Sequence, residues 1–251
     1  MTLLDATDLT LSAPVNLRDL GGIPVTGGSV REGFAIRADD LSIVDLETAS
    51  ALVADGLTTI IDLRSADEVE FTGRGPFGTL PVTYHHVPFM TSIGEASAEA
   101  LDQTKFGSMY VRMMVEAAPR VVQALAVIAY APGAVAFHCA AGQDRTGVLA
   151  ASLLLALGAE PEAIVADYVR TGENSDAIMR RLEPTIGRMM AKFGIHLDAA
   201  ARAAMRAEFS PEPIRGLLAH LGAGSPDPLA ALREAGLTDG LIARLRERAV
   251  A

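Results

Sequence analysis

The sequence contains one cysteine and no tryptophan among its 251 residues, and it has no long apolar run, linker or repeat. A single cysteine excludes an internal disulfide. No stretch reaches the ~18 uninterrupted apolar residues of a membrane span, and residues 1–14 form no recognisable secretory signal. The lack of a linker rich in proline, glycine or serine indicates one domain over residues 1–251. We therefore expect a single-domain, cytoplasmic protein without a membrane span.

Positive charge is also scarce in this chain. The sequence has 21 lysines and arginines against 31 aspartates and glutamates, which gives a formal net charge of −10. Such a charge repels nucleic acid and anionic membranes, so neither is expected as a partner. Apolar residues make up 50% of the chain and suffice for one large core. A positively charged site must therefore be a local exception.

The single cysteine lies in the run His-Cys-Ala-Ala-Gly-Gln-Asp-Arg-Thr-Gly at 138–147. This run follows the strand-like residues 134–137 and precedes the helical residues 148–157, which places the cysteine at a strand-to-helix turn. With a glycine in the turn, successive backbone N–H groups can curl round one anion while the helix N-terminus points at it. The run predicts a phosphate-binding loop, with substrate bound by Ala140, Ala141, Gly142, Gln143, Asp144 and Arg145.

Each residue type in this loop suits phosphate chemistry. A helix N-terminus and a neighbouring cation favour the thiolate form of a cysteine, which predicts Cys139 as a nucleophile. The planar fork of Arg145 can hold two phosphoryl oxygens at once. We expect Thr146 to place its hydroxyl near the sulfur and His138 to orient the loop backbone by hydrogen bonding.

These residues resemble a known family. The spacing Cys-x5-Arg is the signature of cysteine-dependent phosphatases, and the ten-residue run resembles the bacterial branch typified by mycobacterial protein tyrosine phosphatase B. Similar motifs of that branch occur at residues 16–22, 61–65 and 167–174. The resemblance implies a protein-tyrosine-phosphatase-like fold and hydrolysis of phosphate monoesters through a phosphocysteine, with no cofactor and no metal. Relatives of this kind can be exported without a cleavable signal, so the resemblance leaves the compartment open.

The chain departs from this branch at one position of the loop. The branch usually carries lysine two positions before the arginine, where this chain has Gln143. A lysine would favour multiply charged substrates such as phosphoinositides, so its absence favours a phosphotyrosine protein or a small phosphate monoester as the substrate. A phosphoinositide or phosphoserine/threonine phosphatase of the same mechanism and a phosphate-binding pseudophosphatase remain alternatives. The expected inhibitors are phosphate and vanadate-like anions.

The proton donor for the leaving group is less clear from the sequence. No aspartate follows the strand-like residues 82–87, where the mobile acid loop of such enzymes would come. The resemblance favours Asp144, inside the loop, as general acid, with a role in bracing the loop as its alternative. Asp62 is the second candidate, although we expect it to form a structural ion pair with Arg64. We expect Arg18 and Asp19 to brace the catalytic loop rather than only to hold the N-terminal segment.

The apolar pattern of the first two-thirds predicts an α/β fold with a central, mostly parallel sheet flanked by helices. Ligands bind at the carboxyl ends of the strands in such sheets, which is where Cys139 falls. The pattern predicts strands at 34–37, 57–63, 82–87 and 134–137 and helices at 45–55, 107–130 and 148–157, the second of them restarting at Pro119.

The residues after 160 have a helical pattern throughout. We expect helices at 161–170, 176–193 with a break near Pro184, 197–209 and 211–221, followed by two short helices within 227–251. Two interpretations of residues 176–210 stay open: extra core packing, the commoner use of such an apolar stripe, or a helical lid over the active site.

Overall fold

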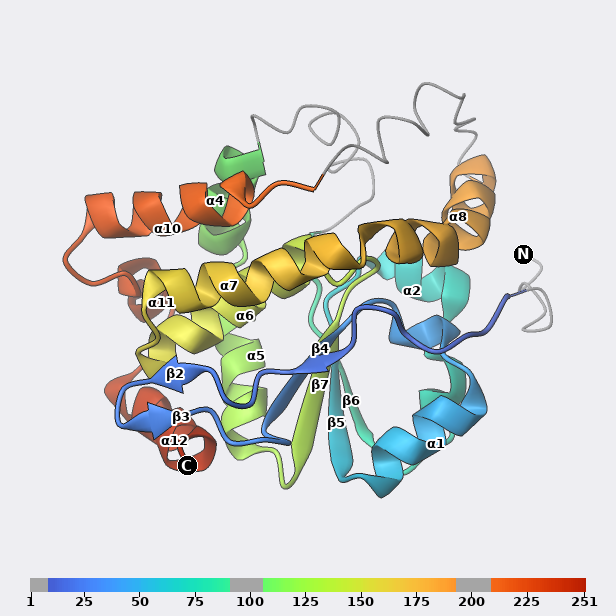
Figure 1. The fold of residues 1–251 in the computed structure, drawn as a ribbon, viewed down its shortest axis with the longest axis horizontal. Helices are drawn as coiled ribbons and strands as arrows, with labels where there is room; N and C mark the ends of the chain where they lie inside the picture. Colours follow the sequence, from blue (N-terminus) through green and yellow to red (C-terminus); the bar gives the residue numbers. More distant parts are fainter. Residues whose placement is uncertain (1–8, 91–105, 193–208) are drawn as a thin grey trace.

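The computed structural model describes residues 9–90, 106–192 and 209–251, which form a five-stranded sheet with helices on both faces (Figure 1). The strand order is β1-β4-β7-β5-β6. Strand β1 is antiparallel to β4, whereas all other neighbours are parallel. The predicted α/β fold with a mostly parallel sheet is therefore confirmed. The strands are β1 (Arg18–Asp19), β4 (Ala35–Ala38), β5 (Leu57–Asp62), β6 (Thr83–His86) and β7 (Ala134–His138).

Strand β7 lies in the middle of the sheet, and its side chains alternate between two apolar cores. Val135 and Phe137 belong to the larger core, and Ala136 belongs to the smaller one on the opposite face. All five residues of β7 are buried, as a strand covered by helices on both faces requires. The residue after this strand is Cys139, so the fold places the thiol at the centre of the sheet's carboxyl edge.

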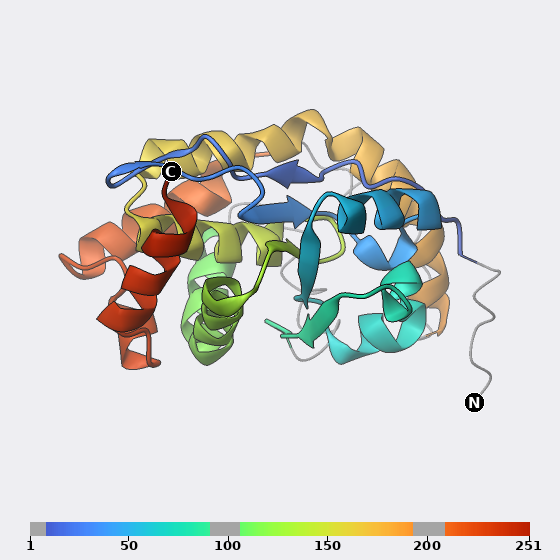
Figure 2. The ribbon, with the colours of Figure 1, turned by 90° about the horizontal axis from the view of Figure 1, so that it is seen from below.

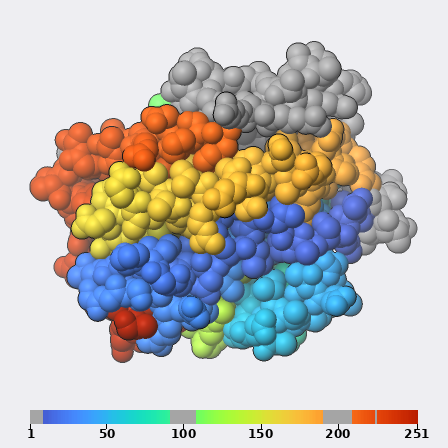
Figure 3. Space-filling view, in the orientation of Figure 1, coloured from blue at the N-terminus to red at the C-terminus, as the bar shows by residue number. Residues whose placement is uncertain are grey.

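The helices cover the sheet unequally. Helix α1 (Leu46–Ala54) packs on the smaller core, and α2 (Ala66–Thr72) lies on the same side of the sheet in Figure 1. The larger core is covered by α4 (Phe106–Glu116), α5 (Ala118–Tyr130), α6 (Asp144–Leu157), α7 (Pro161–Glu173), α10 (Glu212–Gly224), α11 (Ala230–Glu234) and α12 (Asp239–Ala249). Helix α8 (Ser175–Lys192) continues from the end of α7, and the two form a band across one face of the molecule (Figure 3).

Several short elements were not predicted from the sequence. These are β1, the hairpin of β2 (Pro24–Val25) and β3 (Gly28–Ser29), and helix α2. Each strand among them has two residues, too few to show an alternating pattern. The predicted break at Pro184 is wrong, because α8 runs through it. Proline removes one N–H from the helix. The helix is nevertheless packed against the protein on both sides of Pro184, through the buried Ile178 and Leu182 before it and Met189 after it.

The C-terminal segment packs as predicted, with two short helices on the core. Helices α11 and α12 contribute Leu232 and Leu245 to the larger core. The last residues return to the N-terminal hairpin, where Val250 pairs with Val30 and the Ala251 N–H donates to the Ser29 carbonyl. Figure 2 shows this arrangement from below, with α12 beside α5. The single-domain organisation stays a prediction.

Within the described ranges, no single helix has the length and apolar character needed to cross a membrane. Helices α4 and α5 reach that length only together, and they bend by 72° where they meet.

Candidate active site

The catalytic loop connects the end of β7 to the start of α6. Cys139 is 1% exposed at the start of this loop, and Asp144 is the first residue of the helix. The N-cap residue of α6 is Gln143, and among the described residues no side-chain capping hydrogen bond forms there. The first N–H groups of the helix and its positive dipole end therefore face the loop.

The carbonyl groups of the loop are bonded to the surrounding framework. The Asp40 N–H donates to the Ala140 carbonyl at 2.8 Å. The Asn16 amide donates to the carbonyls of Ala141 (3.1 Å) and Gly142 (3.3 Å). In a trans peptide the N–H points away from the C=O of the same unit, and the described residues contain no cis peptide. The N–H groups of residues 141–143 consequently point away from the framework, toward the inside of the loop.

Gly142 fits its position for two reasons. Its φ of +68° lies in the left-handed region, and a Cβ there would lie 2.5 Å from the carbonyl oxygen of Ala38. A residue with a side chain would therefore strain this turn.

A buried ion-pair network lies behind the loop. Asp167 on α7 binds Arg18 on β1 (Nε–Oδ1 2.9 Å) and Arg37 on β4 (Nη1–Oδ2 2.5 Å). Burial opposes its charge, but the two guanidinium groups hold the pKa of Asp167 below its usual value. Arg37 also donates to the Gly142 carbonyl at 2.8 Å. The network therefore connects two strands, a helix and the loop through charged hydrogen bonds.

Of the two N-terminal residues predicted to brace the loop, only Arg18 is connected to it. Its Nη1 donates to the side-chain oxygen of Asn16 at 2.6 Å, and Asn16 in turn holds the loop carbonyls. The expectation for Asp19 is wrong. Its carboxylate accepts from the N–H groups of Gly21 and Gly33, both at 2.6 Å, because neighbouring residues of a strand point to opposite faces.

Arg145 pairs with a residue that the sequence analysis missed. Both Nη atoms of its guanidinium bind the carboxylate of Glu68 on α2, and the Nη2–Oε1 distance is 3.0 Å. Although burial opposes its charge, Glu68 and Cys139 together raise the pKa of Arg145. The guanidinium has five N–H donors, so this pairing leaves others for phosphoryl oxygens.

Glu68 is itself held by the start of its helix. It is the third residue after Ser65, and the two form a capping box in which the Ser65 N–H donates to Oε2 at 2.7 Å. The sequence Ser-x-x-Glu at 65–68 could have revealed this helix start. The capping box therefore orients the Glu68 carboxylate, and this carboxylate in turn orients the Arg145 guanidinium.

Asp62 and Arg64 form the predicted structural ion pair. The Nη2–Oδ2 distance is 2.6 Å, both side chains are buried, and the Tyr84 hydroxyl also donates to Asp62. Burial opposes its charge, but His138, Arg64 and Tyr84 together hold the pKa of Asp62 far below its usual value. A carboxylate in this state carries no proton for a leaving group.

His138 lies beside this pair and contacts the loop backbone. Its Nδ1 is 3.3 Å from the Leu41 amide nitrogen and 3.2 Å from the Cys139 carbonyl oxygen, so either tautomer connects the ring to the backbone. Burial lowers the pKa of His138, against the opposing effect of the Asp62 charge. This geometry matches the orienting role predicted for it.

Thr146 follows Arg145 in the first turn of α6. Its hydroxyl is buried and has no hydrogen-bond partner in the part of the chain that the structure describes. Thr146 is the first fully buried residue of α6. A role for this hydroxyl near the sulfur stays a prediction.

Asp144 has surroundings unlike those of the other carboxylates. Its Oδ1 accepts from the Tyr110 hydroxyl of α4 at 2.7 Å, and Tyr110 contacts the Tyr168 hydroxyl of α7 at 2.7 Å. Burial raises the pKa of Asp144, against the weaker opposing effects of Tyr110 and Arg145. The carboxyl therefore keeps its proton to higher pH than an ordinary aspartate.

The start of α8 is fixed to the framework of the loop. Arg181 binds Asp39 at 2.7 Å in a buried ion pair. Ile178 and Leu182 pack against Ile43, with Ala140 of the loop at the edge of this cluster. These contacts favour core packing for this part of residues 176–210. Of the remaining residues of the predicted lid, 193–208 lie outside the described residues.

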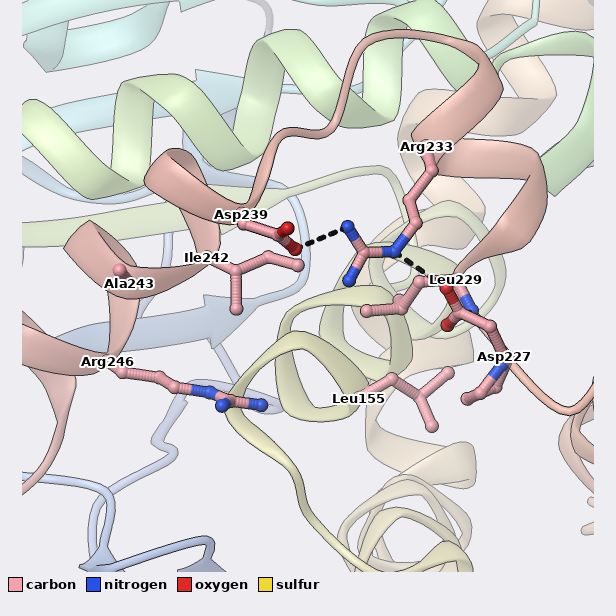
Figure 4. Close-up of a pocket in the computed structure, with 9 residues that line it drawn as sticks. Leu155, Asp227, Leu229, Arg233, Asp239, Ile242, Ala243 and Arg246 are labelled. Atoms are coloured by element: carbon pink, nitrogen blue, oxygen red, sulfur yellow. Dashed lines mark hydrogen bonds and ion pairs between the residues drawn. The ribbon is translucent and has the colours of Figure 1, made fainter.

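A second depression lies away from the loop, between the end of α6 and the helices α11 and α12 (Figure 4). Arg233 spans it and binds Asp227 and Asp239, each at 2.6 Å. Leu155 lines it at a helix position roughly 16 Å along the α6 axis from Asp144. Because it lies this far from the loop, the depression is no part of the candidate active site.

Comparison with known proteins agrees with this geometry. A family model described as the tyrosine phosphatase family matches residues 9–251. The chain is 27% identical over 203 residues to the triple specificity protein phosphatase PtpB of Mycobacterium tuberculosis, covering 68% of this chain and 71% of the relative. It is 29% identical over 180 residues to a putative tyrosine-protein phosphatase of Cupriavidus necator, covering 67% and 64%. A tyrosine-protein phosphatase of Nostoc commune is 31% identical over 142 residues, covering 53% and 46%. The chain belongs to the tyrosine phosphatase family and is a phosphatase.

Proposed function

We propose that the chain hydrolyses phosphotyrosine in proteins through a phosphocysteine formed on Cys139. The observation that carries this proposal is the convergence of one thiol, the inward N–H groups of residues 141–143 and the Arg145 guanidinium on a single loop. These groups match a phosphoryl group, which needs a nucleophile on one side and donors for its equatorial oxygens.

In the first step, the thiol of Cys139 loses its proton to solvent and its sulfur attacks phosphorus. The S–P bond forms while the bond from phosphorus to the tyrosine oxygen breaks, and the electron pair of that bond stays on the oxygen. Asp144 gives its proton to this oxygen, so the product leaves as a neutral phenol. Loop N–H groups and Arg145 bind the equatorial oxygens, whose charge they stabilise in the transition state.

In the second step, a water oxygen attacks the phosphorus of the phosphocysteine. The S–P bond breaks, its electron pair returns to sulfur, and the ionised Asp144 accepts the proton of the water. Inorganic phosphate leaves, Asp144 is protonated again, and the Cys139 thiolate takes back from solvent the proton that the thiol released. No other reactant is needed.

Asp144 suits the acid role better than Asp62 does. Burial raises the pKa of Asp144, whereas the arginine and tyrosine around Asp62 hold its pKa far below the usual value. Asp144 also belongs to the loop that binds the phosphoryl group, while Asp62 is bonded to Arg64. These observations support Asp144 as the general acid.

Two features support phosphotyrosine as the substrate. Cys139 is 1% exposed, so an aryl phosphate, which extends far from its backbone, reaches the sulfur more easily than a short phosphoserine. Gln143 stands where a lysine would favour a multiply charged inositol headgroup, and it brings no charge to the loop. Its amide lies 3.5 Å from the Tyr168 hydroxyl. The name of the M. tuberculosis relative describes a triple specificity, which makes the other substrate classes necessary comparisons.

The test compares kcat/KM on a phosphotyrosine peptide, the matching phosphoserine and phosphothreonine peptides, and a soluble phosphoinositide. We expect the phosphotyrosine peptide to be preferred by at least about tenfold, and vanadate to compete with it. Cys139→Ser should abolish turnover and keep the fold. A preference for the phosphoinositide would overturn the substrate, and binding of phosphopeptide without any hydrolysis by the wild type would indicate a pseudophosphatase.

A further inference from the structure

We propose that Tyr110 is a positioning residue for Asp144, at the end of a one-way hydrogen-bond chain that runs from Gln143 through Tyr168 and Tyr110 to the carboxyl group. The inference rests on the proposed function, because it assumes that Asp144 is the general acid. It adds a residue on α4, outside every motif that the sequence analysis singled out.

The direction of the chain follows from the number of hydrogens. A tyrosine hydroxyl has one hydrogen to donate, and that of Tyr110 is directed to Oδ1 of Asp144 at 2.7 Å. The contact of 2.7 Å between the two hydroxyls must then be a donation from Tyr168 to Tyr110. The Gln143 amide donates to the Tyr168 hydroxyl at 3.5 Å, the longest contact of the chain.

This direction decides which oxygen of Asp144 carries the transferable proton. Oδ1 is occupied as an acceptor, so the proton belongs on Oδ2. When the proton leaves, negative charge develops on the carboxylate, and the aligned donors stabilise it. Tyr110 thus makes Asp144 a stronger acid than burial alone would allow, and it fixes the rotation of the carboxyl group.

The hydrogen-bond chain is rigid because the rings of Tyr110 and Tyr168 are both buried. Tyr110 is fully buried and Tyr168 is 1% exposed, and their rings meet edge to face with centroids 6.2 Å apart. Phe209 covers the Tyr168 ring at 5.3 Å between centroids. A Cβ at Gly147 would lie 3.0 Å from the Tyr168 ring, so α6 and α7 approach closely here.

The charged and titratable groups facing this chain come from three helices and one strand. Arg145 on α6 acts on Asp144, and Arg37 on β4 acts on Tyr168. Burial and the Asp144 charge raise the pKa of Tyr168 above its usual value, so its hydroxyl stays protonated throughout the working range. Burial, Asp144 and Tyr168 likewise raise the pKa of Tyr110. Asp144 is therefore the group of this hydrogen-bond chain that gains and loses a proton during activity.

The experiment measures kcat/KM against pH for Tyr110→Phe, which keeps the ring and removes the hydroxyl. Loss of this donor raises the pKa of Asp144, so the alkaline limb should move up by about 1 pH unit. With phenyl phosphate, a poor leaving group, kcat/KM at the plateau should fall about tenfold. The loss should shrink with 4-nitrophenyl phosphate, whose leaving group needs less protonation. The control is Tyr130→Phe, at a tyrosine that is 68% exposed on α5, and it should change neither quantity.

Two results would overturn the proposal: an unmoved alkaline limb in folded Tyr110→Phe, or an equal loss with both leaving groups. If Tyr110→Phe does not fold, Tyr168→Phe is measured in its place. It should move the alkaline limb of the kcat/KM profile in the same direction by a smaller amount. An unmoved limb in Tyr168→Phe would also contradict the hydrogen-bond chain. Failure of the proposed function gives a different result, namely a Cys139→Ser variant that still turns over.

Discussion

The two sides of the catalytic loop hold their carboxyl groups in opposite ways. Behind the loop, Asp167 is bound by two arginines, and its pKa is held below the usual value. At the start of α6, Asp144 accepts from a neutral tyrosine hydroxyl, and burial raises its pKa. The difference shows that the choice of partner decides whether a carboxyl group serves as a fixed charge or as a proton donor.

Removing the fixed charge should have the largest effect on stability. Asp167→Asn leaves Arg18 and Arg37 buried without their shared partner, which costs about 3–5 kcal/mol in the free energy of unfolding. Urea unfolding measures this loss, with Glu162→Gln, at an exposed ion pair on the same helix, as the control. Equal stability of the two variants would show that the network behind the loop is not a structural support.

Acid should weaken the same support without any mutation. The folded-state pKa values of Asp62, Asp167 and Glu68 are all depressed, so each carboxylate contributes stability above its unfolded pKa. That stability is complete above roughly pH 5 and is lost as the pH falls through 4 and below, because the unfolded state then binds more protons. Asp144, whose pKa is raised, acts in the opposite sense. Unfolding free energies measured from pH 7 to pH 3 should therefore decrease, and a flat profile would contradict the assignment of these three as fixed charges.

Glu68→Gln tests whether a third carboxylate, that of Glu68, acts by positioning Arg145. The amide keeps the size of the side chain but cannot accept the Arg145 fork with both atoms, so the guanidinium loses its orientation. We expect kcat/KM to fall by about tenfold, chiefly through kcat, because a misplaced Arg145 binds the transition state less well. Asp67→Asn, at the neighbouring position of α2, is the control. An unchanged kcat would show that Glu68 does not position Arg145.

The smallest effect is expected at Asp19, which holds a turn rather than the loop. Asp19→Ala removes the acceptor of two backbone N–H groups and should cost about 1 kcal/mol of stability while kcat stays unchanged. Thermal unfolding together with the turnover rate checks both statements. A large loss of kcat in a stable variant would restore the role in bracing the loop that the sequence suggested for this residue.

The parts predicted correctly from the sequence depend on neighbouring residues. The central strands, the turn at Gly142 and the restart of a helix at Pro119 follow from local pattern and backbone preference. The parts missed depend on contacts between distant segments. Glu68 meets Arg145 across 77 positions and Tyr110 meets Asp144 across 34, and no local pattern encodes either pair. Asp19 shows the same limit, because only the pairing of β1 with β4 decides which face its side chain takes.

The most direct test of the whole account is to trap the covalent intermediate. Wild-type protein mixed with a phosphorus-labelled aryl phosphate is quenched with acid within milliseconds, digested and analysed by mass spectrometry. The account predicts one added phosphoryl group on the peptide that contains Cys139, and its absence from Cys139→Ser. Phosphorus on another residue, or turnover by Cys139→Ser at the wild-type rate, would contradict it.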